Sequence, residues 1–307
     1  MTHSTRRRRL RISITVDFDS VSGLLGTSHS PENNLADYSA AVFAAHAGVG
    51  RLLKVFQKHG IAQDVTWFIP GHSMESFPKS TERIVKSGGE IGLHGYSHES
   101  AYALTEEQER DVLESCIELA TALCHGKRPV GNRAPLYQIR ESTINLLQEH
   151  GFLYDSSLNS HDAIPYLLPT PYSGIKFVIA DYTKPASTWM KPTQLPAEPT
   201  RGSEEAAQSL VEIPGSWYTE DATPLCFYPH LDNSHAYVAV DVVEKMWMDR
   251  FDWIWENECW IDGLDDDDNS DFTPNAKGFG AFFPIILHPE QHKNGKILKR
   301  MNYESLS

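Results

Sequence analysis

The sequence has 307 residues, of which 40% are hydrophobic and 22% charged, and its formal net charge is −14. This composition is typical of a globular protein and excludes one that holds nucleic acid or an anionic membrane by its overall charge. Four cysteines without a CxxC pair, no run of 18 apolar residues and no secretory signal pattern after Arg6–Arg9 predict a cytoplasmic protein without a membrane span.

Strand-like and helix-like segments alternate along the chain after residues 1–10, which we expect to form a disordered basic tail. Short β-rich runs predict strands, and apolar stripes with capping residues and terminal glycines predict helices. The expected strands are 11–18, 64–69, 90–94, 129–134, 152–155, 176–181, 210–214 and 281–287. The expected helices are 46–59, 81–87, 105–124, 140–150 and 238–257.

The repeated strand-then-helix order predicts an α/β fold with parallel strands and helices packed outside them. Seven or eight such strands can close into a barrel, and a doubly wound open sheet is the alternative. Residues 183–209 are rich in Pro, Thr, Ser and Glu and are interpreted as an irregular insertion that could serve an interface between copies of the chain. We therefore expect residues 11–307 to form one domain.

Asp17 and Asp19 end the first predicted strand and share one of its faces, because successive strand side chains point to opposite sides. The carboxyl ends of parallel strands are where α/β folds place their active sites. One carboxylate could bind a metal ion while the other handles a proton. Two solvated acids at a strand end are the alternative interpretation.

His94 and His98 follow the third predicted strand and are four residues apart, so a helical turn would bring both imidazoles to one ion. The same spacing occurs at His288 and His292, so the spacing alone is a weak signal among 14 histidines. The placement at the end of a strand is what favours a metal site. Together with Asp19, the two histidines would leave coordination positions open for water, as a catalytic metal site requires.

Three more segments follow predicted strands and would lie on the same rim. Arg133 could pair with a buried carboxylate and lower its pKa. Trp217 could floor a pocket, and Asp221 could orient Arg133. His288 could act as a general acid toward a leaving amine. Taken singly, a surface arginine, an aromatic turn and a structural histidine are the plainer interpretations, but their common placement favours an amide hydrolase.

These segments, in this order, resemble the polysaccharide deacetylase family with the NodB homology domain, also called carbohydrate esterase family four, over about residues 10–300. The motifs that carry the resemblance are Val16–Asp19, His94–Glu99, Arg133–Pro135 and Leu287–Pro289. Their form is similar to a cytosolic branch that includes peptidoglycan deacetylase-like proteins and cyclic imide hydrolases. The resemblance implies a distorted (β/α) barrel that binds a divalent metal, usually zinc.

The resemblance also implies residue roles. Asp17 would be the general base, steered by Arg133, and His288 the general acid. The metal ligands would be Asp19, His94 and His98. The substrate pocket would include Leu136, Tyr137, Trp217, Asp221 and Leu287, with Leu287 near the acyl methyl group and a backbone N–H near Leu136 facing the oxyanion. The family's two aspartates are adjacent, whereas Phe18 separates them here, which leaves open which aspartate does which job.

The expected function is removal of acetyl groups from N-acetylglucosamine residues of chitin or chitooligosaccharides, with release of acetate and with peptidoglycan as a related target. Ring opening of a cyclic imide or ureide is the alternative reaction, and an inactive carbohydrate-binding barrel is the alternative without catalysis. Cytoplasmic placement favours the imide, and the family's commonest activity favours deacetylation. We expect a carbohydrate or small amide partner, no nucleic acid and no membrane, and the chain could form a homo-oligomer.

Overall fold

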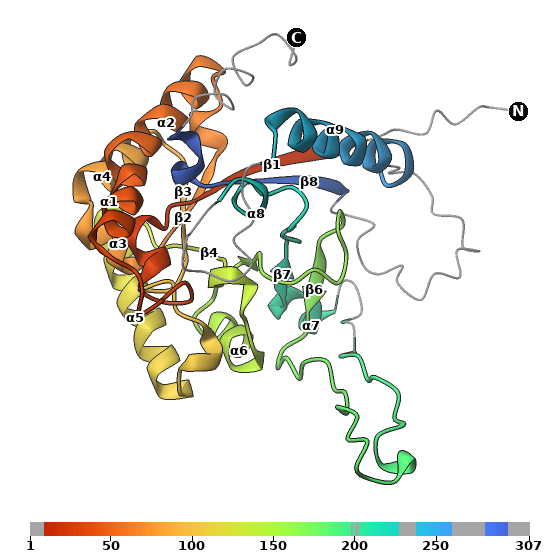
Figure 1. Ribbon diagram of the computed structural model, residues 1–307. Helices are drawn as coiled ribbons and strands as arrows, with labels where there is room; N and C mark the ends of the chain where they lie inside the picture. The colour runs from red at the N-terminus through yellow and green to blue at the C-terminus, as the bar shows by residue number, and fades with distance from the viewer. Residues whose placement is uncertain (1–8, 198, 200–202, 227–237, 260–279, 294–307) are drawn as a thin grey trace, which may run out of the picture.

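A curled, mostly parallel sheet organises the computed structural model, which describes residues 9–197, 199, 203–226, 238–259 and 280–293 (Figure 1). The strand order is β6-β7-β5-β4-β3-β2-β1-β8. All neighbouring pairs are parallel except β6 with β7. The strands are β1 (Leu10–Asp17), β2 (Thr66–Ile69), β3 (Glu90–Leu93), β4 (Gly131–Asn132), β5 (Tyr154–Asp155), β6 (Tyr166–Leu168), β7 (Leu210–Glu212) and β8 (Ala281–Leu287). The α/β fold with a barrel-like parallel sheet is confirmed, in the form of a half-barrel.

Helices cover the outside of this sheet, as the alternating sequence pattern predicts (Figure 1). They are α1 (Leu35–Phe43), α2 (Val49–Lys58), α3 (Gly71–Ser76), α4 (Pro78–Lys86), α5 (Glu106–Leu123), α6 (Glu141–Glu149), α7 (Glu204–Gln208), α8 (Ala222–Leu225) and α9 (Val240–Asn257). The start of α5 shows the local cause: the Thr105 side chain accepts from the Gln108 N–H while the Gln108 side chain accepts from the Thr105 N–H. This capping box satisfies two N–H groups that a helix start leaves without partners.

Between α1 and α2 the helix continues through a π-helical turn, Ala44–Gly48, so the helical run begins at Leu35, well before the predicted start at residue 46. By length and composition alone this run, Leu35–Lys58, could cross a membrane, a property that it shares with core helices, and half of its apolar window is buried. Leu52 and Phe56 are fully buried, and the Phe56 ring meets Trp67 of β2 edge to face at 6.2 Å. The run therefore packs onto the sheet with its apolar side.

Strands β1 and β8 form the longest pairing in the sheet, in register from Leu10 with Ala281 to Val16 with Leu287. The first and last of the described strands are thus neighbours. Because they are parallel, their carboxyl ends lie together, and the residues that follow each strand meet on one rim. The expected tail, residues 1–10, is shorter, because Leu10 begins β1 and the Arg9 N–H donates to the Cys259 carbonyl oxygen at 2.9 Å. Residues 1–8 lie outside the described residues.

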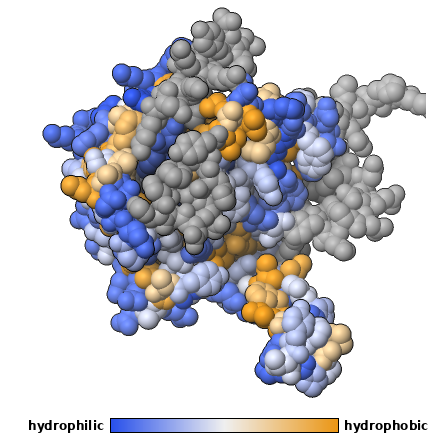
Figure 2. Space-filling view, in the orientation of Figure 1, coloured by the Kyte–Doolittle hydropathy of each residue, from blue (hydrophilic) through white to orange (hydrophobic). Residues whose placement is uncertain are grey.

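The predicted strand 176–181 is wrong. Lys176 makes one antiparallel bridge with Gln194, and the segment between them forms an arm that leaves the body of the molecule (Figure 1). Its apolar side chains face outward, as Phe177 at 65% and Ile179 at 80% exposure show, and Figure 2 shows apolar surface where the arm leaves the body. None of the described strands pairs with these residues, so alternation alone did not make a strand. That the insertion serves an interface stays a prediction.

The strand that closes this side of the sheet is instead β6, Tyr166–Leu168, which pairs antiparallel with β7. It is short and flanked by Pro165 and Pro169, and prolines confine strands to edges because they lack an N–H donor. Because of these features, the sequence pattern did not predict β6 as a strand.

Candidate active site

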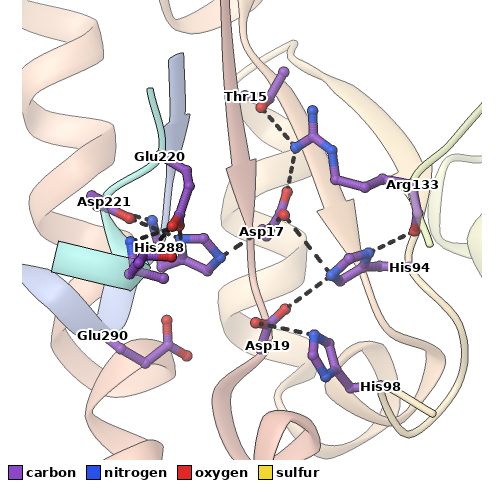
Figure 3. A network of polar contacts seen from close by, with 12 residues as sticks. Thr15, Asp17, Asp19, His94, His98, Arg133, Glu220, Asp221, His288 and Glu290 are labelled. Carbon is purple, nitrogen blue, oxygen red and sulfur yellow. Dashed lines mark hydrogen bonds and ion pairs between the residues drawn. The ribbon is translucent and has the colours of Figure 1, made fainter. Parts of the chain in front are cut away.

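A cavity opens at the carboxyl ends of β1, β3, β4 and β8, and side chains from all four strand ends point into it (Figure 3). It collects most of the residues that the sequence singled out. The cavity is lined by Asp17, Asp19, Gly23, Ser28, His94, His98, Arg133, Ala134, Leu136, Tyr137, Trp217, Glu220, Ala222, Cys226, Ile286, His288, Glu290 and Gln291. The predicted convergence of separate motifs on one rim is therefore a property of the structure.

Asp17 is buried at the end of β1 and is held by Arg133, which is 1% exposed. Arg133 Nη1 donates to Asp17 Oδ1 at 2.7 Å and to Thr15 Oγ1 at 2.9 Å, and its guanidinium carbon lies 4.3 Å from the centre of the Phe68 ring. Burial by itself would raise the pKa of Asp17, but Arg133, followed by His94 and His288, lowers it below its ordinary value. Asp17 is therefore ionised. Arg133 binds its Oδ1 atom, so its Oδ2 atom is the one that faces the cavity.

Asp19 lies two residues after Asp17, between two histidines. Its Oδ1 is 3.5 Å from His94 Nε2, and its Oδ2 is 3.5 Å from His98 Nε2. Asp19 Oδ1 is buried and accepts no hydrogen bond from the described residues. Phe18 makes this arrangement: its ring is buried in the core, its N–H donates to Phe68 O, and the chain then turns at Asp19 into an α-type conformation. The two aspartates thus reach one cavity from different directions.

The other ring nitrogen of each histidine is held from behind. His94 Nδ1 is 2.6 Å from the Arg133 carbonyl oxygen, and His98 Nδ1 is 2.7 Å from Thr27 Oγ1. These contacts leave both Nε2 atoms facing Asp19. Burial lowers the pKa of His94, and it lowers the pKa of His98 to about 4. Both rings are therefore neutral at ordinary pH, which is the form that binds metals.

The predicted helical turn across His94 and His98 is wrong. The segment after β3 is irregular, and His98 has a left-handed backbone with φ of 60°. Its carbonyl accepts from the Thr27 N–H and hydroxyl, and a Cβ at Gly26 would collide with that carbonyl. The two imidazoles therefore reach one place because a distant loop fixes His98, and helical spacing plays no part.

His288 approaches from the opposite side, just after β8. Its Nε2 is 3.9 Å from Asp17 Oδ2, and its Nδ1 is 2.8 Å from Asp221 Oδ1. The His288 backbone N–H also donates to Asp221 Oδ2 at 3.1 Å. Burial acts to lower the pKa of His288, but Asp221 and then Asp17 raise it well above its ordinary value. His288 is therefore protonated, and its ring lines the cavity.

This contact corrects the expected role of Asp221. We expected Asp221 to orient Arg133 and to line the substrate pocket, whereas its carboxylate is 1% exposed and is bound to His288. The partners of Arg133 are Thr15, Asp17 and Ser156 instead. Sequence order could not decide this, because the segment with Asp221 runs beside the end of β8, where the Asp221 N–H donates to Ile286 O.

Leu136, Tyr137 and Trp217 line the cavity. That they contact a substrate stays a prediction. Leu136 and Tyr137 have left-handed backbones, with φ of 49° and 56°. The Tyr137 and Trp217 rings meet edge to face at 4.6 Å between centres. Leu136 is the second residue of the short 3-10 turn Pro135–Tyr137, and the first N–H groups of such a turn have no acceptor inside it.

Leu287 does not lie in the cavity. It is 1% exposed and belongs to the hydrophobic core, whereas Ile286 lines the cavity. Strand alternation explains the correction, because Ile286 and His288 share one face of the β8 end and Leu287 takes the other. Ile286 therefore lines the cavity where Leu287 was expected to do so.

Several residues of the site were not singled out from the sequence. Thr15 could have been found, because it shares a strand face with Asp17. Glu290 lies two residues after His288, and its Oε1 accepts from the Ser20 N–H at 2.6 Å. Thr27 and Glu220 carry no local signal, since each is brought to the site only by the folding of its loop.

Asp19, His94 and His98 fit a divalent metal ion. Within the described part of the chain, one ligand atom of each side chain lies within 4.8 Å of the other two. The donor set is one carboxylate and two neutral imidazoles, each imidazole with its second nitrogen already engaged, and Asp19 Oδ1 is a buried oxygen without a donor. Zinc is bound by such ligands in catalytic sites.

Comparison with known proteins agrees with this geometry. Residues 41–154 match the family model for polysaccharide deacetylase. A "peptidoglycan deacetylase-like protein" of Gibberella zeae is 50% identical over 285 residues, which are 92% of this chain and 76% of that protein. A "peptidoglycan deacetylase" of Helicobacter pylori is 40% identical over 81% of this chain and 79% of its own length.

Among solved structures, a Mycobacterium smegmatis protein assigned to the polysaccharide deacetylases superimposes with a TM-score of 0.69 at 24% identity, covering 96% of this chain and 82% of that one. This likeness concerns the fold. The sequence identity to the fungal and bacterial relatives, which extends over most of both chains, decides the family. The chain belongs to the polysaccharide deacetylase family, whose members are hydrolases acting on carbon–nitrogen bonds.

Proposed function

We propose that this protein is a metal-dependent N-deacetylase that removes acetyl groups from N-acetylglucosamine residues, with chitin or chitooligosaccharides as substrate and release of acetate. Peptidoglycan carries the same acetamido sugar and is the related target, which the names of the two curated relatives support. The observation that carries the proposal is the meeting of an ionised Asp17, the Asp19–His94–His98 group and a protonated His288 around one cavity.

Asp19, His94 and His98 would hold the divalent ion, most simply zinc, which polarises a carbonyl oxygen and makes water a stronger acid when it is bound. Asp17 Oδ2 then accepts the proton of the attacking water. Arg133 occupies the other oxygen of Asp17, so the carboxylate keeps one orientation and stays ionised. Proton transfer by such a positioned base contributes about 10²–10⁴-fold to the rate.

His288 supplies the proton that the departing nitrogen needs. Its Nδ1 is fixed by Asp221, so Nε2 is the atom that faces the cavity. The Leu136 N–H is the proposed donor to the oxygen that becomes negative during attack, and one such donor contributes about 10²–10³-fold. Ile286 offers an apolar wall for the acetyl methyl group.

A paired substrate assay tests this function. Acetate release from chitooligosaccharides and from peptidoglycan fragments is measured beside ring opening of succinimide and hydantoin, each with and without a chelator. We expect acetate release that the chelator abolishes and that added zinc restores. Ring opening without acetate release would replace the substrate class, and a protein without bound metal and without any turnover would favour an inactive carbohydrate-binding barrel.

Replacing Asp221 with asparagine tests the acid. Among its neighbours, Asp221 raises the pKa of His288 the most, so Asp221→Asn lets His288 lose its proton at lower pH. We expect the alkaline limb of kcat/KM to move to lower pH, because the protonated His288 is the active form. The pH profile of acetate release measures this. Asp181→Asn on the exposed arm is the matched control, and an unmoved alkaline limb in Asp221→Asn would rule out His288 as the acid.

A further inference from the structure

Two carboxyl side chains face each other behind the cavity. Asp155 ends β5 and Glu212 ends β7, and the parallel register makes them partners across the two strands. Both side chains are fully buried, with 0% exposure. Neither residue forms an ion pair with a lysine, arginine or histidine among the described part of the chain.

Each carboxyl group has one oxygen that accepts and one that lacks a donor. Asp155 Oδ1 accepts from Asn132 Nδ2 at 2.7 Å, and Glu212 Oε1 accepts from the N–H groups of Ser157 and Leu158 at 2.9 and 3.0 Å. Asp155 Oδ2 and Glu212 Oε2 are buried and accept no N–H or O–H from any described residue outside the pair. Two neighbouring carboxyl groups in a site without water do not both ionise. One proton shared between them replaces the repulsion of two negative charges with a hydrogen bond.

The surroundings favour Glu212 as the carrier of that proton. Burial first, and then the neighbouring Asp155, raises the pKa of Glu212 well above its ordinary 4.5. Burial also raises the pKa of Asp155, but hydrogen bonds led by that from Asn132 act in the opposite direction. The other titratable groups that face Glu212 are Tyr166 on β6 and Tyr172 beyond it, whose own pKa values are raised.

The pair supports the segment that holds Arg133. Ser156 Oγ accepts from Arg133 Nη2 at 3.0 Å, and the Ser156 carbonyl accepts from Arg133 Nε at 3.3 Å. Ser157 Oγ accepts from the Ala134 N–H at 2.8 Å. Glu212 fixes the Ser157 N–H, so it acts on this segment directly.

We propose that Asp155 and Glu212 share one proton and, as positioning residues, hold Ser156 and Ser157 in the place where they orient Arg133 and, through it, Asp17. The link to Asp17 rests on the proposed function. The shared proton does not, because it follows from the two facing carboxyl groups alone.

Amide substitutions test whether the pair of carboxyl groups holds one shared proton or none. In Glu212→Gln the amide NH₂ can donate to Asp155 Oδ2 while its oxygen still accepts from Ser157 and Leu158, so this variant imitates a permanently protonated Glu212. In the double variant Asp155→Asn with Glu212→Gln, two NH₂ groups oppose each other and the pair has no acceptor between them. We expect kcat within about twofold of wild type for Glu212→Gln and a fall of at least about tenfold for the double variant, with metal content unchanged in both.

Two measurements need no substrate. The infrared difference spectrum of wild type minus Glu212→Gln at neutral pH should show the band of a protonated carboxyl group. The folded wild type keeps a proton that the unfolded chain releases above the ordinary pKa of 4.5, so its Tm should fall relative to that of Glu212→Gln as the pH rises above that value. Glu106→Gln, at an exposed carboxyl in the first turn of α5, is the matched control and should show neither effect.

The outcomes are distinct. Carboxylate bands alone in the difference spectrum, together with a pH-independent Tm difference, would overturn the shared proton even if the double variant fails to fold. A double variant that folds and keeps wild-type kcat would overturn the positioning role. Failure of the proposed function is a different result, in which the wild type turns over no acetylated substrate while the infrared and thermal results stand.

Discussion

Replacing Asp17 with asparagine is expected to lower kcat by about 10²–10⁴-fold while the bound metal is retained. The physical reason is that asparagine keeps the shape of the side chain but cannot accept the proton of the attacking water. Asp17 is not one of the three side chains that converge as the metal group, which are Asp19, His94 and His98. The measurement is kcat for acetate release beside the zinc content of the purified variant.

Asp19→Asn provides the contrast that decides the order of roles. This variant removes a charge from the metal group, so it should lose both metal and turnover. Asp17→Asn with near-wild-type rates would place the base elsewhere. If Asp17→Asn loses its metal and Asp19→Asn keeps it, then Asp17 is the metal ligand and Asp19 the base. The insertion of Phe18 between the two aspartates left this order open in the sequence.

Replacing Arg133 with methionine is expected to lower the free energy of unfolding by about 3–5 kcal/mol, because it leaves the Asp17 carboxylate buried without its cation. The free energy of unfolding is measured by chemical denaturation. In the double variant Asp17→Asn with Arg133→Met the loss should be clearly smaller than the sum of the single losses, since no charge is then stranded. The lowered pKa of Asp17 gives the pH dependence: the stabilisation is complete above the ordinary value of 3.8 and is lost as the pH falls through the lower folded value.

Arg110→Met is the matched control for burial. Arg110 pairs with the carboxylate of Glu149 through two hydrogen bonds, but both side chains are exposed, at 39% and 56%. Exposed pairs contribute about 0–1 kcal/mol, so this variant should be nearly neutral. Equal losses in Arg133→Met and Arg110→Met would show that burial of the Asp17 pair has no special weight.

Much of the site followed from strand ends, because parallel order brought the ends of β1, β3, β4 and β8 to one rim. Alternation predicted one shared face for Asp17 and Asp19, but β1 ends at Asp17 and the chain turns at Asp19, so the two carboxylates reach the cavity from different directions. The same rule, applied to β8, would have put Ile286 in the cavity and Leu287 in the core. There the prediction followed the family's motif, and local physics was the better guide.

The contacts between segments far apart in the chain could not be predicted in this way. The backbone of His98 is fixed by Thr27, and the orientation of His288 by Asp221; neither partner has a sequence pattern that points to its role. The strand predicted at residues 176–181 failed for the opposite reason. Its pattern is strand-like, but within the described part of the chain its one β-type pairing is the Lys176–Gln194 bridge.

The neighbouring positions of β1 and β8 have a consequence for the order of folding. The proposed base Asp17 ends β1 and the proposed acid His288 follows β8, so the two side chains meet only after β8 has paired with β1. Pairings between such distant segments form late in folding, because a long loop must close first. A folding intermediate in which β8 is not yet paired would therefore hold Asp19, His94 and His98 without the proposed acid, and the proposed reaction would depend on this last pairing.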